Sequence, residues 1–394
     1  MKQPRPNPQT PRILFFTSVF GRSTVGGTTF VSYLLGASRR GDANIRFASA
    51  DIQGTDDPLL LPVRTPALLN ALPLPWLSQS VLFRRLAARP DVGVSTDLIW
   101  HNNLITAAAF ALFPVRVPVV GMINDYSNLQ TSSPLASRRE FGAYRSAVRW
   151  FWRGIERFVA RRVDTVVVNS EYLKRRVIEE YGVPPERVEL LYKGVDLDRF
   201  SPDSTRTLAE SPSPPTRILF LKSDFVRGGL WDLFEALQGL PEEVTLTVAG
   251  PAESFHSRIM TRARDAGLAD RVFWRGNTPH REVDRLLGEH DMLCVPSRSE
   301  ALGVVFLEAL AAGIPAVGTS AGGISEVLDG GRAGWLAPPQ DPAGLLETLK
   351  EATTNHQERA SRVSHGLGHV RRFSTVVMID RLLALAGKTM RPIK

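Results

Sequence analysis

The stretch Glu300-Ala-Leu-Gly-Val-Val-Phe-Leu-Glu308 places two carboxylates on either side of a glycine, at a point where a strand should turn into a helix. Upstream, the apolar run Met292–Pro296 is typical of a short buried strand that ends in a Pro-Ser turn. Downstream, residues 304–312 are apolar and helix-forming, and Gly313 followed by Pro315 is a typical helix end. This stretch therefore predicts the strand–turn–helix unit of an α/β fold.

The same stretch has the chemistry of a ligand site. The amides of Gly303, Val304 and Val305 open the expected helix, and an open helix N-terminus attracts phosphate. Glu308 lies about one turn further along, where its carboxylate can bind vicinal hydroxyls, and Glu300 faces another part of the same ligand. Amides that can bind phosphate, together with carboxylates that can bind hydroxyl groups, indicate a site for a nucleotide sugar. The alternative is an amphipathic helix with solvated glutamates.

Further motifs extend this pattern along the chain. They are Ala309-Leu-Ala-Ala-Gly-Ile-Pro-Ala-Val317, Gly322-Gly-Ile-Ser-Glu326, Asn169-Ser-Glu-Tyr-Leu173, Tyr181-Gly-Val-Pro-Pro-Glu-Arg-Val188, and Gly194-Val-Asp196 with Phe200-Ser-Pro202. Together with the two glutamates, they resemble the retaining glycosyltransferases of family 4 from about residue 12 to 385. The resemblance implies an α/β GT-B fold, in which two Rossmann-like domains face each other across a cleft and the C-terminal domain binds the donor.

The resemblance also implies roles for the residues of the opening stretch. Glu308 would bind the ribose hydroxyls, Glu300 the hydroxyls of the transferred sugar, and the amides of residues 303–305 the distal phosphate. Glu326 would either contact the donor or cap its own helix. The co-substrate would be a nucleoside-diphosphate sugar, with UDP favoured, and no other cofactor is expected.

Members of the family supply an Arg and a Lys after the first strand of the second domain, where they stabilise the leaving diphosphate. Here Lys222 and Arg227 have the five-residue spacing with the two types exchanged, and another register places Ser223 and Gly228 there. Arg227 is the preferred candidate because its fork can hold two phosphate oxygens. Lys222 is a second catalytic candidate, or a surface lysine.

Candidates in the N-terminal half follow strand ends. Gly26, Gly27 and Thr28 start a helix where backbone can approach a ligand closely, Gly27 on the donor side and the other two on the acceptor side. Asn124 and Asp125 follow a strand where relatives carry a His-Asp pair. Asp125 is the catalytic candidate and Asn124 an acceptor-side one, unless the pair only shapes a turn. A last acceptor-side candidate, His101, is more simply read as structural.

No metal site is expected. The pair Asp196 and Asp198 imitates an Asp-x-Asp metal motif, but it lies in a segment that the resemblance makes a connecting element. His256, His280 and His290 show no ligand spacing, and the single cysteine cannot build a zinc site.

A chain of 394 residues is long for one domain. We expect a Pro-rich tail (1–11), an acceptor-binding domain (12–200), a Ser/Pro-rich linker (201–216), a donor-binding domain (217–373) and a last helix (374–394) that packs back on the first domain. Strands are expected at 12–19, 44–50, 98–100, 118–123, 165–168, 217–221, 244–249, 272–274, 292–295 and 316–318. Residues 56–90 should be irregular, with a short helix near 80–88.

The net charge of +8 indicates either that the protein binds an anionic partner or that it exposes a basic surface to water. Arg145, Arg149, Arg153, Arg157 and Arg161 recur every four residues, among aromatic side chains. Such a helix could lie on an anionic membrane surface, or simply expose a basic face. The longest apolar region is interrupted by prolines and an arginine, so no membrane-spanning helix is expected. With one cysteine, Cys294, a reducing cytoplasm is expected, with peripheral contact to the inner face of the cell membrane.

The sequence leaves three other functions open. A dinucleotide-dependent oxidoreductase would explain Asp51 after the second strand, but Gly21, Gly26 and Gly27 do not form Gly-x-Gly-x-x-Gly. A non-catalytic subunit of the same fold would explain the exchanged Lys222 and Arg227. Nucleic-acid binding would explain the charge, but no motif for it is present. The preferred hypothesis is a metal-independent, retaining glycosyltransferase acting on a glycan, glycolipid or small-molecule acceptor.

Overall fold

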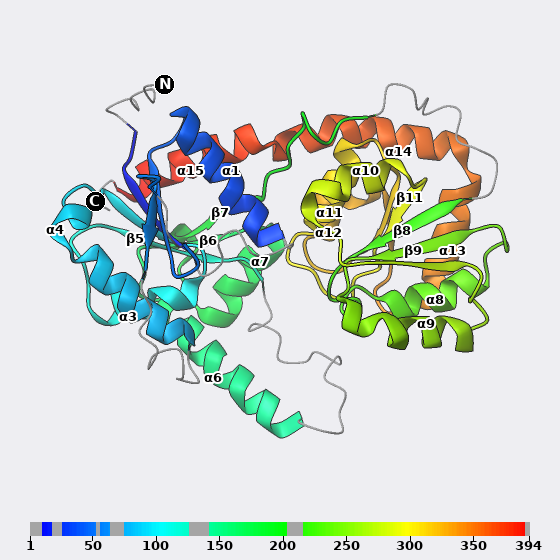
Figure 1. Cartoon of the computed structure of the whole chain (residues 1–394), viewed down its shortest axis with the longest axis horizontal. Helices are drawn as coiled ribbons and strands as arrows, with labels where there is room; N and C mark the ends of the chain where they lie inside the picture. The colour runs from blue at the N-terminus through cyan, green and yellow to red at the C-terminus, as the bar shows by residue number, and fades with distance from the viewer. Residues whose placement is uncertain are drawn as a thin grey trace. The chain divides into compact units, whose positions relative to one another are not determined.

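The computed structural model describes residues 10–17, 26–52, 56–63, 75–125, 142–202 and 216–390; for 26–28, 75–77 and 142–149 it describes the backbone alone. The chain divides into two compact units. The first comprises residues 1–192 and 376–394, and the second residues 193–375 (Figure 1). Most of the segment expected to be a linker, residues 203–215, lies outside the described residues.

The first unit is built on a seven-stranded sheet with the order β3-β2-β1-β4-β5-β6-β7, and every strand pair in it is parallel. Its strands are β1 (Ile13–Phe16), β2 (Ile45–Ser49), β3 (Leu60–Pro62), β4 (Leu98–His101), β5 (Val119–Ile123), β6 (Thr165–Val168) and β7 (Val188–Leu190). Its helices are α1 (Gly26–Arg40), α3 (Pro75–Ala87), α4 (Pro90–Gly93), η1 (Leu104–Ala107), α5 (Ala108–Leu112), α6 (Gly142–Ala160), α7 (Glu171–Arg176), η2 (Val177–Tyr181), η3 (Pro185–Arg187) and most of α15 (Thr375–Thr389). The central strands β1, β4 and β5 are buried and apolar except for His101 at the end of β4, as expected for strands covered on both faces.

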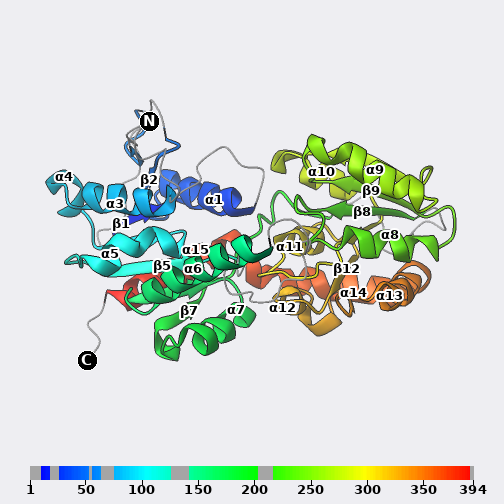
Figure 2. The same ribbon diagram turned by 90° about the horizontal axis from the view of Figure 1, so that it is seen from below.

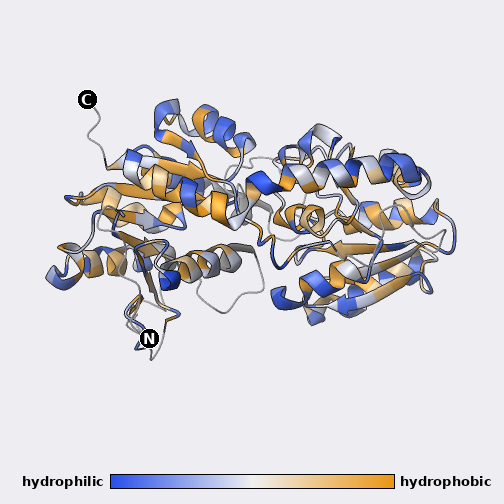
Figure 3. Ribbon diagram, turned by 90° about the horizontal axis from the view of Figure 1, so that it is seen from above, coloured by the Kyte–Doolittle hydropathy of each residue, from blue (hydrophilic) through white to orange (hydrophobic). Residues whose placement is uncertain are grey.

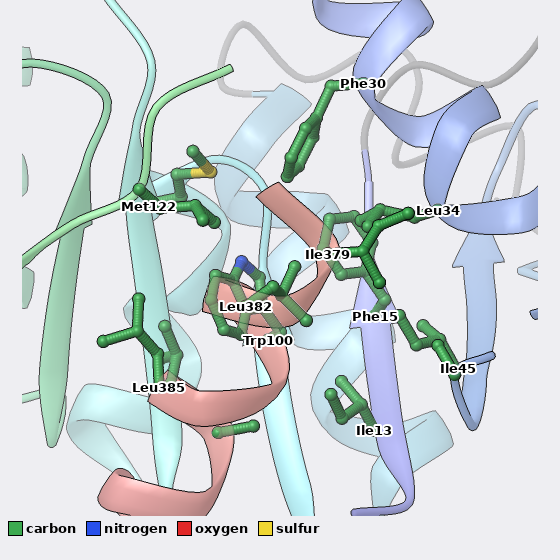
Figure 4. Packing of buried hydrophobic residues seen from close by; sticks show 14 of the residues in the cluster. Ile13, Phe15, Phe30, Leu34, Ile45, Trp100, Met122, Ile379, Leu382 and Leu385 are labelled. Atoms are coloured by element: carbon green, nitrogen blue, oxygen red, sulfur yellow. The ribbon is translucent and has the colours of Figure 1, made fainter. Parts of the chain in front are cut away.

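Helix α15 completes the core of this unit, although the rest of the unit ends near residue 192. Its apolar face places Leu382 and Leu385 beside Trp100 of β4 in one buried cluster (Figure 4). Arg381 and Lys388, which flank this apolar face, form ion pairs with Glu189 of β7. Burial of apolar side chains therefore attaches the last helix to the first unit, and charge pairs border the contact.

The second unit has a six-stranded parallel sheet in the order β10-β9-β8-β11-β12-β13. Its strands are β8 (Arg217–Leu221), β9 (Thr245–Ala249), β10 (Val272–Gly276), β11 (Met292–Cys294), β12 (Ala316–Thr319) and β13 (Trp335–Ala337). Its helices are α8 (Leu230–Gln238), η4 (Glu253–Phe255), α9 (His256–Asp265), η5 (His280–Glu282), α10 (Val283–Gly288), α11 (Val304–Ala311), α12 (Ile324–Val327), η6 (Asp329–Gly331), α13 (Pro342–Thr354), α14 (His356–His369) and η7 (Val370–Phe373). In Figure 2, α9 and α10 lie on one side of strands β8 and β9, and α13 and α14 on the other.

Both sheets have the doubly wound order of a Rossmann fold. In each, the order reverses beside the first strand of the unit, between β1 and β4 and between β8 and β11. The loops that follow such neighbouring strands diverge, so ligands of these folds bind at the carboxyl ends of the strands at that point. The two-sheet α/β architecture expected from the sequence is confirmed.

Hydropathy explains which elements the sequence revealed. The strands are largely apolar, whereas many helices alternate polar and apolar residues (Figure 3). All ten expected strands correspond to observed ones, but β3, β7 and β13 were not anticipated. Each of these three has only three residues, too few for a hydrophobic period to stand out. The helix expected near residues 80–88 is longer, as α3. Within the part of the chain that the structure describes, no helix is long and apolar enough to span a bilayer.

Candidate functional site

The predicted strand–turn–helix unit is present between β11 and α11. Strand β11 is fully buried, and the loop after it leads to Gly303, which caps α11 with a left-handed backbone (φ 91°). A side chain at this position would also meet the ring of Phe306, with a Cβ 2.8 Å from Cδ2. Glycine is required here because an L residue would be strained and would clash. The first amides of α11 therefore open at the carboxyl end of the sheet, beside the reversal of strand order.

Glu300 lies in this loop and forms an ion pair with Lys222 from the loop after β8. Both side chains are largely buried, with 14% and 15% exposed. The Ala301 amide donates to Glu300 Oε1 at 3.1 Å. Burial raises the pKa of Glu300, but the charges of Lys222 and Arg227 outweigh it and hold that pKa below its ordinary value. Glu300 is therefore a carboxylate at neutral pH, facing two cations.

The loop between β8 and α8 is fitted closely against the loop after β11. Gly229 has a left-handed backbone (φ 75°), and a Cβ on it would lie 2.0 Å from the Pro296 carbonyl oxygen. The amide of Arg298 donates to the carbonyl of Arg227 at 2.8 Å. The Arg298 guanidinium holds both carboxylate oxygens of Asp232 on α8, at 2.6 and 3.0 Å. These contacts fix the two loops that carry Glu300, Lys222 and Arg227.

Glu308 occupies the buried side of α11, with 8% of its side chain exposed. Its Oε1 lies 2.8 Å from His280 Nε2. On the other side of the ring, Arg199 donates from Nη1 to His280 Nδ1 at 2.9 Å, and Arg199 also pairs with Asp284 at 2.8 Å. A guanidinium can only donate, so Nδ1 is the acceptor, Nε2 carries the proton, and His280 donates to Glu308. The Asp284–Arg199–His280–Glu308 chain therefore fixes the orientation of this carboxylate.

The sequence interpretation did not select His280 or Arg199. His280 follows the end of β10, the same kind of position that drew attention to Asn124 after β5. Arg199 lies in the segment treated as a connecting element, and its side chain stacks over Phe200, with the guanidinium carbon 4.7 Å from the ring centroid. Their contact partners are far away in sequence, so only the fold reveals them.

Glu326 lies on α12, just after two glycines that touch the same loop. A Cβ on Gly322 would lie 1.7 Å from the Glu300 carbonyl oxygen, and the Gly323 amide donates to that oxygen at 3.2 Å. The amide of Glu326 donates to the Gly323 carbonyl at 3.1 Å, which closes the first turn of α12. The double glycine thus lets α12 lie directly against the backbone of Glu300.

The remaining candidates belong to the first unit. Gly26, Gly27 and Thr28 begin α1, where the structure describes the backbone alone. Asn124 follows β5 and donates from Nδ2 to Asn102 Oδ1 at 3.3 Å, while its carbonyl accepts a hydrogen bond from Asn169 Nδ2 at 2.9 Å. Asp125 is next to it and partly exposed. Three asparagines therefore tie together the ends of β4, β5 and β6.

His101 lies in the core of the first unit. Its side chain is 0% exposed, stacks on Phe16 and contacts the edge of Phe110. Burial lowers its pKa to about 3, so the ring is neutral. Thr106 donates its hydroxyl proton to the Asn103 carbonyl, and it therefore accepts from His101 Nδ1 at 2.9 Å. An acceptor substrate could reach this ring only if the aromatic packing around it opened. The structure therefore does not support the expected contact between His101 and the acceptor substrate.

The basic helix α6 differs in detail from one continuous arginine stripe. Arg153 pairs with Glu180 at 2.7 Å, and Arg161 donates to the Tyr181 carbonyl at 2.6 Å, so both are engaged within the unit. Trp150 and Phe151, in contrast, are exposed by 77% and 47%. The side chains of Arg145 and Arg149 lie outside the described residues. The outer face of α6 is therefore more aromatic than the spacing of arginines indicated.

Comparisons with known proteins agree with this geometry. Residues 26–199 match the family described as "Glycosyltransferase Family 4", and residues 205–366 match "Glycosyl transferases group 1". D-inositol 3-phosphate glycosyltransferase 1 of Catenulispora acidiphila is 28% identical over 58% of either chain. A GDP-mannose-dependent alpha-(1-6)-phosphatidylinositol monomannoside mannosyltransferase of Mycobacterium tuberculosis is 28% identical over 71% of either chain. The match with the first of these spans little more than half of that relative's length.

Solved structures match nearly the whole chain. Sucrose-phosphate synthase from Thermosynechococcus elongatus covers 96% of this chain, which covers 99% of that one, with a TM-score of 0.77 and 17% identity. Anabaena HepE in complex with UDP-glucose gives the same coverages, with a TM-score of 0.71 and 19% identity. At such identities the likeness shows the fold alone. The ordered family matches over both units and the GT-B fold together show that this chain belongs to the family 4, or group 1, glycosyltransferases.

Proposed function

We propose that this protein is a retaining glycosyltransferase that moves a sugar from a nucleoside-diphosphate sugar to a hydroxyl group of an acceptor. The observation that carries the proposal is that two glutamates near the N-terminus of α11 are each held by a separate partner. Glu300 faces Lys222, and Glu308 is held by His280. One short segment thus presents two oriented carboxylates and a helix N-terminus at the carboxyl end of a Rossmann sheet, and the loop after β8 adds a largely buried cation beside them.

Each group has a role that suits its chemistry. The amides of residues 303–305 bind the distal phosphate, since a helix N-terminus favours negative charge. Glu308 accepts hydrogen bonds from the ribose hydroxyls through Oε2, because His280 donates to Oε1. Glu300 accepts from the hydroxyls of the transferred sugar. Lys222 and Arg227 stabilise the charge that develops on the leaving diphosphate.

The proposed reaction is a front-face displacement at the anomeric carbon. The acceptor oxygen forms a bond to that carbon on the side from which the diphosphate leaves, so the configuration is retained. The acceptor proton passes to a departing phosphate oxygen, and the electron pair of the broken C–O bond stays on the diphosphate. From the first unit, Asp125 is the catalytic candidate, Asn124, Gly26 and Thr28 are acceptor-side candidates, and Gly27 is a donor-side candidate. The anomer of the product, read by proton NMR, tests retention.

We further propose that the reaction needs no metal ion. Asp196 and Asp198 have the spacing of a metal motif, but Asp196 Oδ1 accepts the amides of Asp198 and Arg199, at 3.1 and 3.2 Å. The carboxylate thus closes a turn in the segment that positions Arg199. Lys222 and Arg227 supply the positive charge that a divalent cation supplies in other transferases. Turnover that is unchanged by EDTA supports this point, and loss of turnover that Mg²⁺ or Mn²⁺ restores contradicts it.

The donor nucleotide can be identified before any acceptor is known. Similar proteins include a GDP-mannose-dependent enzyme and one solved in complex with UDP-glucose, and UDP remains our prediction. Thermal unfolding should be measured with UDP-, GDP- and other activated sugars and with NAD, for the wild type and for Glu308→Gln. Stabilisation by one nucleotide sugar, lost in the variant and absent with NAD, supports the proposal. Stabilisation by NAD alone would indicate an oxidoreductase.

A non-catalytic nucleotide-sugar-binding subunit is the second candidate, because the order of Lys222 and Arg227 departs from the family pattern. Many transferases hydrolyse their donor slowly when no acceptor is present. Release of the nucleoside diphosphate by the wild type but not by Lys222→Met would exclude this candidate. Donor binding without any release, even with a panel of acceptors, would favour it.

Contact with an anionic membrane surface is proposed for the outer face of α6. Trp150, Phe151 and Arg157 are exposed there, and aromatic side chains with a basic residue suit the interface of an anionic bilayer. Flotation with vesicles containing anionic lipid should recover the wild type, and Trp150→Ala with Arg157→Glu should reduce recovery. Equal recovery with purely zwitterionic vesicles, or no recovery, would contradict the proposal.

A further inference from the structure

A second cluster of polar side chains lies in the second unit, apart from the groups assigned to the donor. His365 and His369 lie one turn apart on α14, and Asp329 begins η6. One ligand atom from each of the three lies within 4.8 Å of the others. Within the described residues, it is the one group of three such side chains close enough to share an ion. The two imidazole rings are stacked, with an interplanar angle of 16°.

The hydrogen bonds of His369 leave one nitrogen directed at this cluster. Its Nε2 lies 3.3 Å from the backbone carbonyl oxygen of Glu326, which can only accept, so Nε2 carries a proton. Nδ1 then presents its lone pair to Asp329 Oδ2 at 3.8 Å. Two facing lone pairs repel each other, and a cation held between them removes that repulsion. In a typical metal-binding histidine, one ring nitrogen donates to a carbonyl and the second ring nitrogen binds the metal ion.

His365 supplies the second nitrogen. Its Nε2 lies 2.7 Å from Asp329 Oδ2, so in the ion-free protein it donates to the carboxylate. An incoming cation would replace that proton, which moves to Nδ1 or to solvent, and would bind the Nε2 lone pair. Two imidazole nitrogens and one carboxylate oxygen are a common ligand set for Zn²⁺, at about 2.0–2.2 Å. Tetrahedral ligands at that length are about 3.3 Å apart, so small side-chain rotations would suffice.

We propose that Asp329, His365 and His369 bind Zn²⁺, with solvent in the remaining position. Arg332 is the competing cation, because its guanidinium lies 2.8 Å from Asp329 Oδ2. Its side chain is 72% exposed, and ion pairs of such exposed arginines contribute little to stability. When the metal binds Asp329 Oδ2, Arg332 can therefore turn to solvent or form its ion pair with Asp329 Oδ1.

The metal would act as a structural tie rather than in the transfer reaction. It would join α14 to η6, directly after α12, whose first turn follows the glycines packed on Glu300. Gly366, between the two histidines, lies against Leu310 of α11, where a Cβ would be 2.8 Å from Cδ2. The site would therefore hold together the helices that support the donor loop. It does not depend on which sugar nucleotide binds.

Isothermal titration of the tag-free, chelator-treated full chain with Zn²⁺ tests the proposal. The wild type should bind one equivalent and unfold at a higher temperature with Zn²⁺ than with EDTA. His365→Gln and His369→Gln should each weaken the affinity at least about tenfold. The control is His256→Gln, since His256 lies 3.8 Å from Glu253 but belongs to no group of three potential ligands among the described residues.

The zinc affinities of the four proteins distinguish a site at Asp329, His365 and His369 from binding elsewhere. One equivalent of Zn²⁺ retained by the wild type and the His256 variant, but lost with His365 and His369, supports the site. Binding that is equal in all four proteins, or absent from the wild type, overturns it. Because the folded fraction is measured on the same samples by circular dichroism, a variant that fails to fold is replaced by Asp329→Asn, which removes the carboxylate charge. None of these results bears on donor binding, which is measured separately.

Discussion

Lys222 and Glu300 form an ion pair between the loops that follow β8 and β11, the two strands beside which the sheet order reverses. The pair joins the carboxylate assigned to the transferred sugar with the cation assigned to the leaving group. Because both side chains are largely buried, replacing one partner leaves the other charge without compensation. In the proposed reaction, the pair would connect donor binding with departure of the diphosphate.

Replacing Lys222 should reduce turnover more than donor affinity. Lys222→Met removes positive charge that acts on the developing diphosphate, and loss of one such group costs about 10²- to 10³-fold in kcat. Lys222→Arg should restore part of the rate because it restores the charge. Glu300→Ala should likewise lower kcat more than affinity. Steady-state kinetics with isothermal titration of the donor checks this; an unchanged kcat for Lys222→Met would remove its catalytic role.

Replacing His280 should weaken nucleotide binding although it is assigned no contact with the donor. His280→Leu deletes the hydrogen bond that fixes Glu308, and the donor Kd should rise about tenfold, the equivalent of roughly 1.4 kcal/mol. His280→Gln keeps an N–H donor and should recover part of the affinity. Arg281→Ala is the matched control, since the neighbouring Arg281 side chain is 81% exposed. Equal affinities for the His280→Leu and Arg281→Ala variants would refute the positioning role.

Gly322 and Gly267 offer a matched pair for testing the packing of α12 on the donor loop. Both have left-handed backbones, but a Cβ on Gly322 would lie 1.7 Å from the Glu300 carbonyl oxygen, whereas a Cβ on Gly267 meets nothing within 4 Å. Either alanine should cost about 1–2 kcal/mol in backbone strain. Gly322→Ala alone should also abolish measurable donor binding. Denaturant unfolding and donor titration separate the two effects, and equal donor affinity in both variants would contradict the prediction.

His101 should make the protein less stable in mild acid. Burial lowers its pKa in the folded chain to about 3, from an ordinary value of 6.5. Below pH 6.5 the unfolded chain takes up a proton that the folded chain does not, so this contribution is complete above pH 6.5 and falls by about 1.4 kcal/mol per pH unit down to pH 3. His101→Phe should remove that dependence. Urea unfolding between pH 7 and pH 4.5 tests this, and parallel pH profiles for both proteins would disprove it.

The sequence predicted the parallel sheets and the strand–turn–helix around Gly303, because these depend on local hydrophobic runs and on a glycine with a defined conformation. It also indicated which loops carry Lys222 and Glu300, although not that the two side chains pair. His280 and Arg199 were missed because their contacts with Glu308 and Asp284 join distant segments. His101 resembled a site residue because it ends a strand, but the rings of Phe16 and Phe110 enclose it.

His365 and His369 carried a visible signal, the four-residue spacing that puts two side chains on one helix face. The expectation of no metal site rested instead on His256, His280 and His290, which show no ligand spacing. The third group, Asp329, lies thirty-six residues from His365 and has a left-handed backbone (φ 51°). Local spacing can reveal such a pair, whereas the completing residue depends on the fold.

A crystal soaked with UDP or GDP tests the central claim most directly. The account predicts density for the phosphates at the amides of residues 303–305 and for the ribose hydroxyls at Glu308 Oε2, with His280 still donating to Oε1. Nucleotide density elsewhere on the protein, with solvent alone at the start of α11, would contradict it.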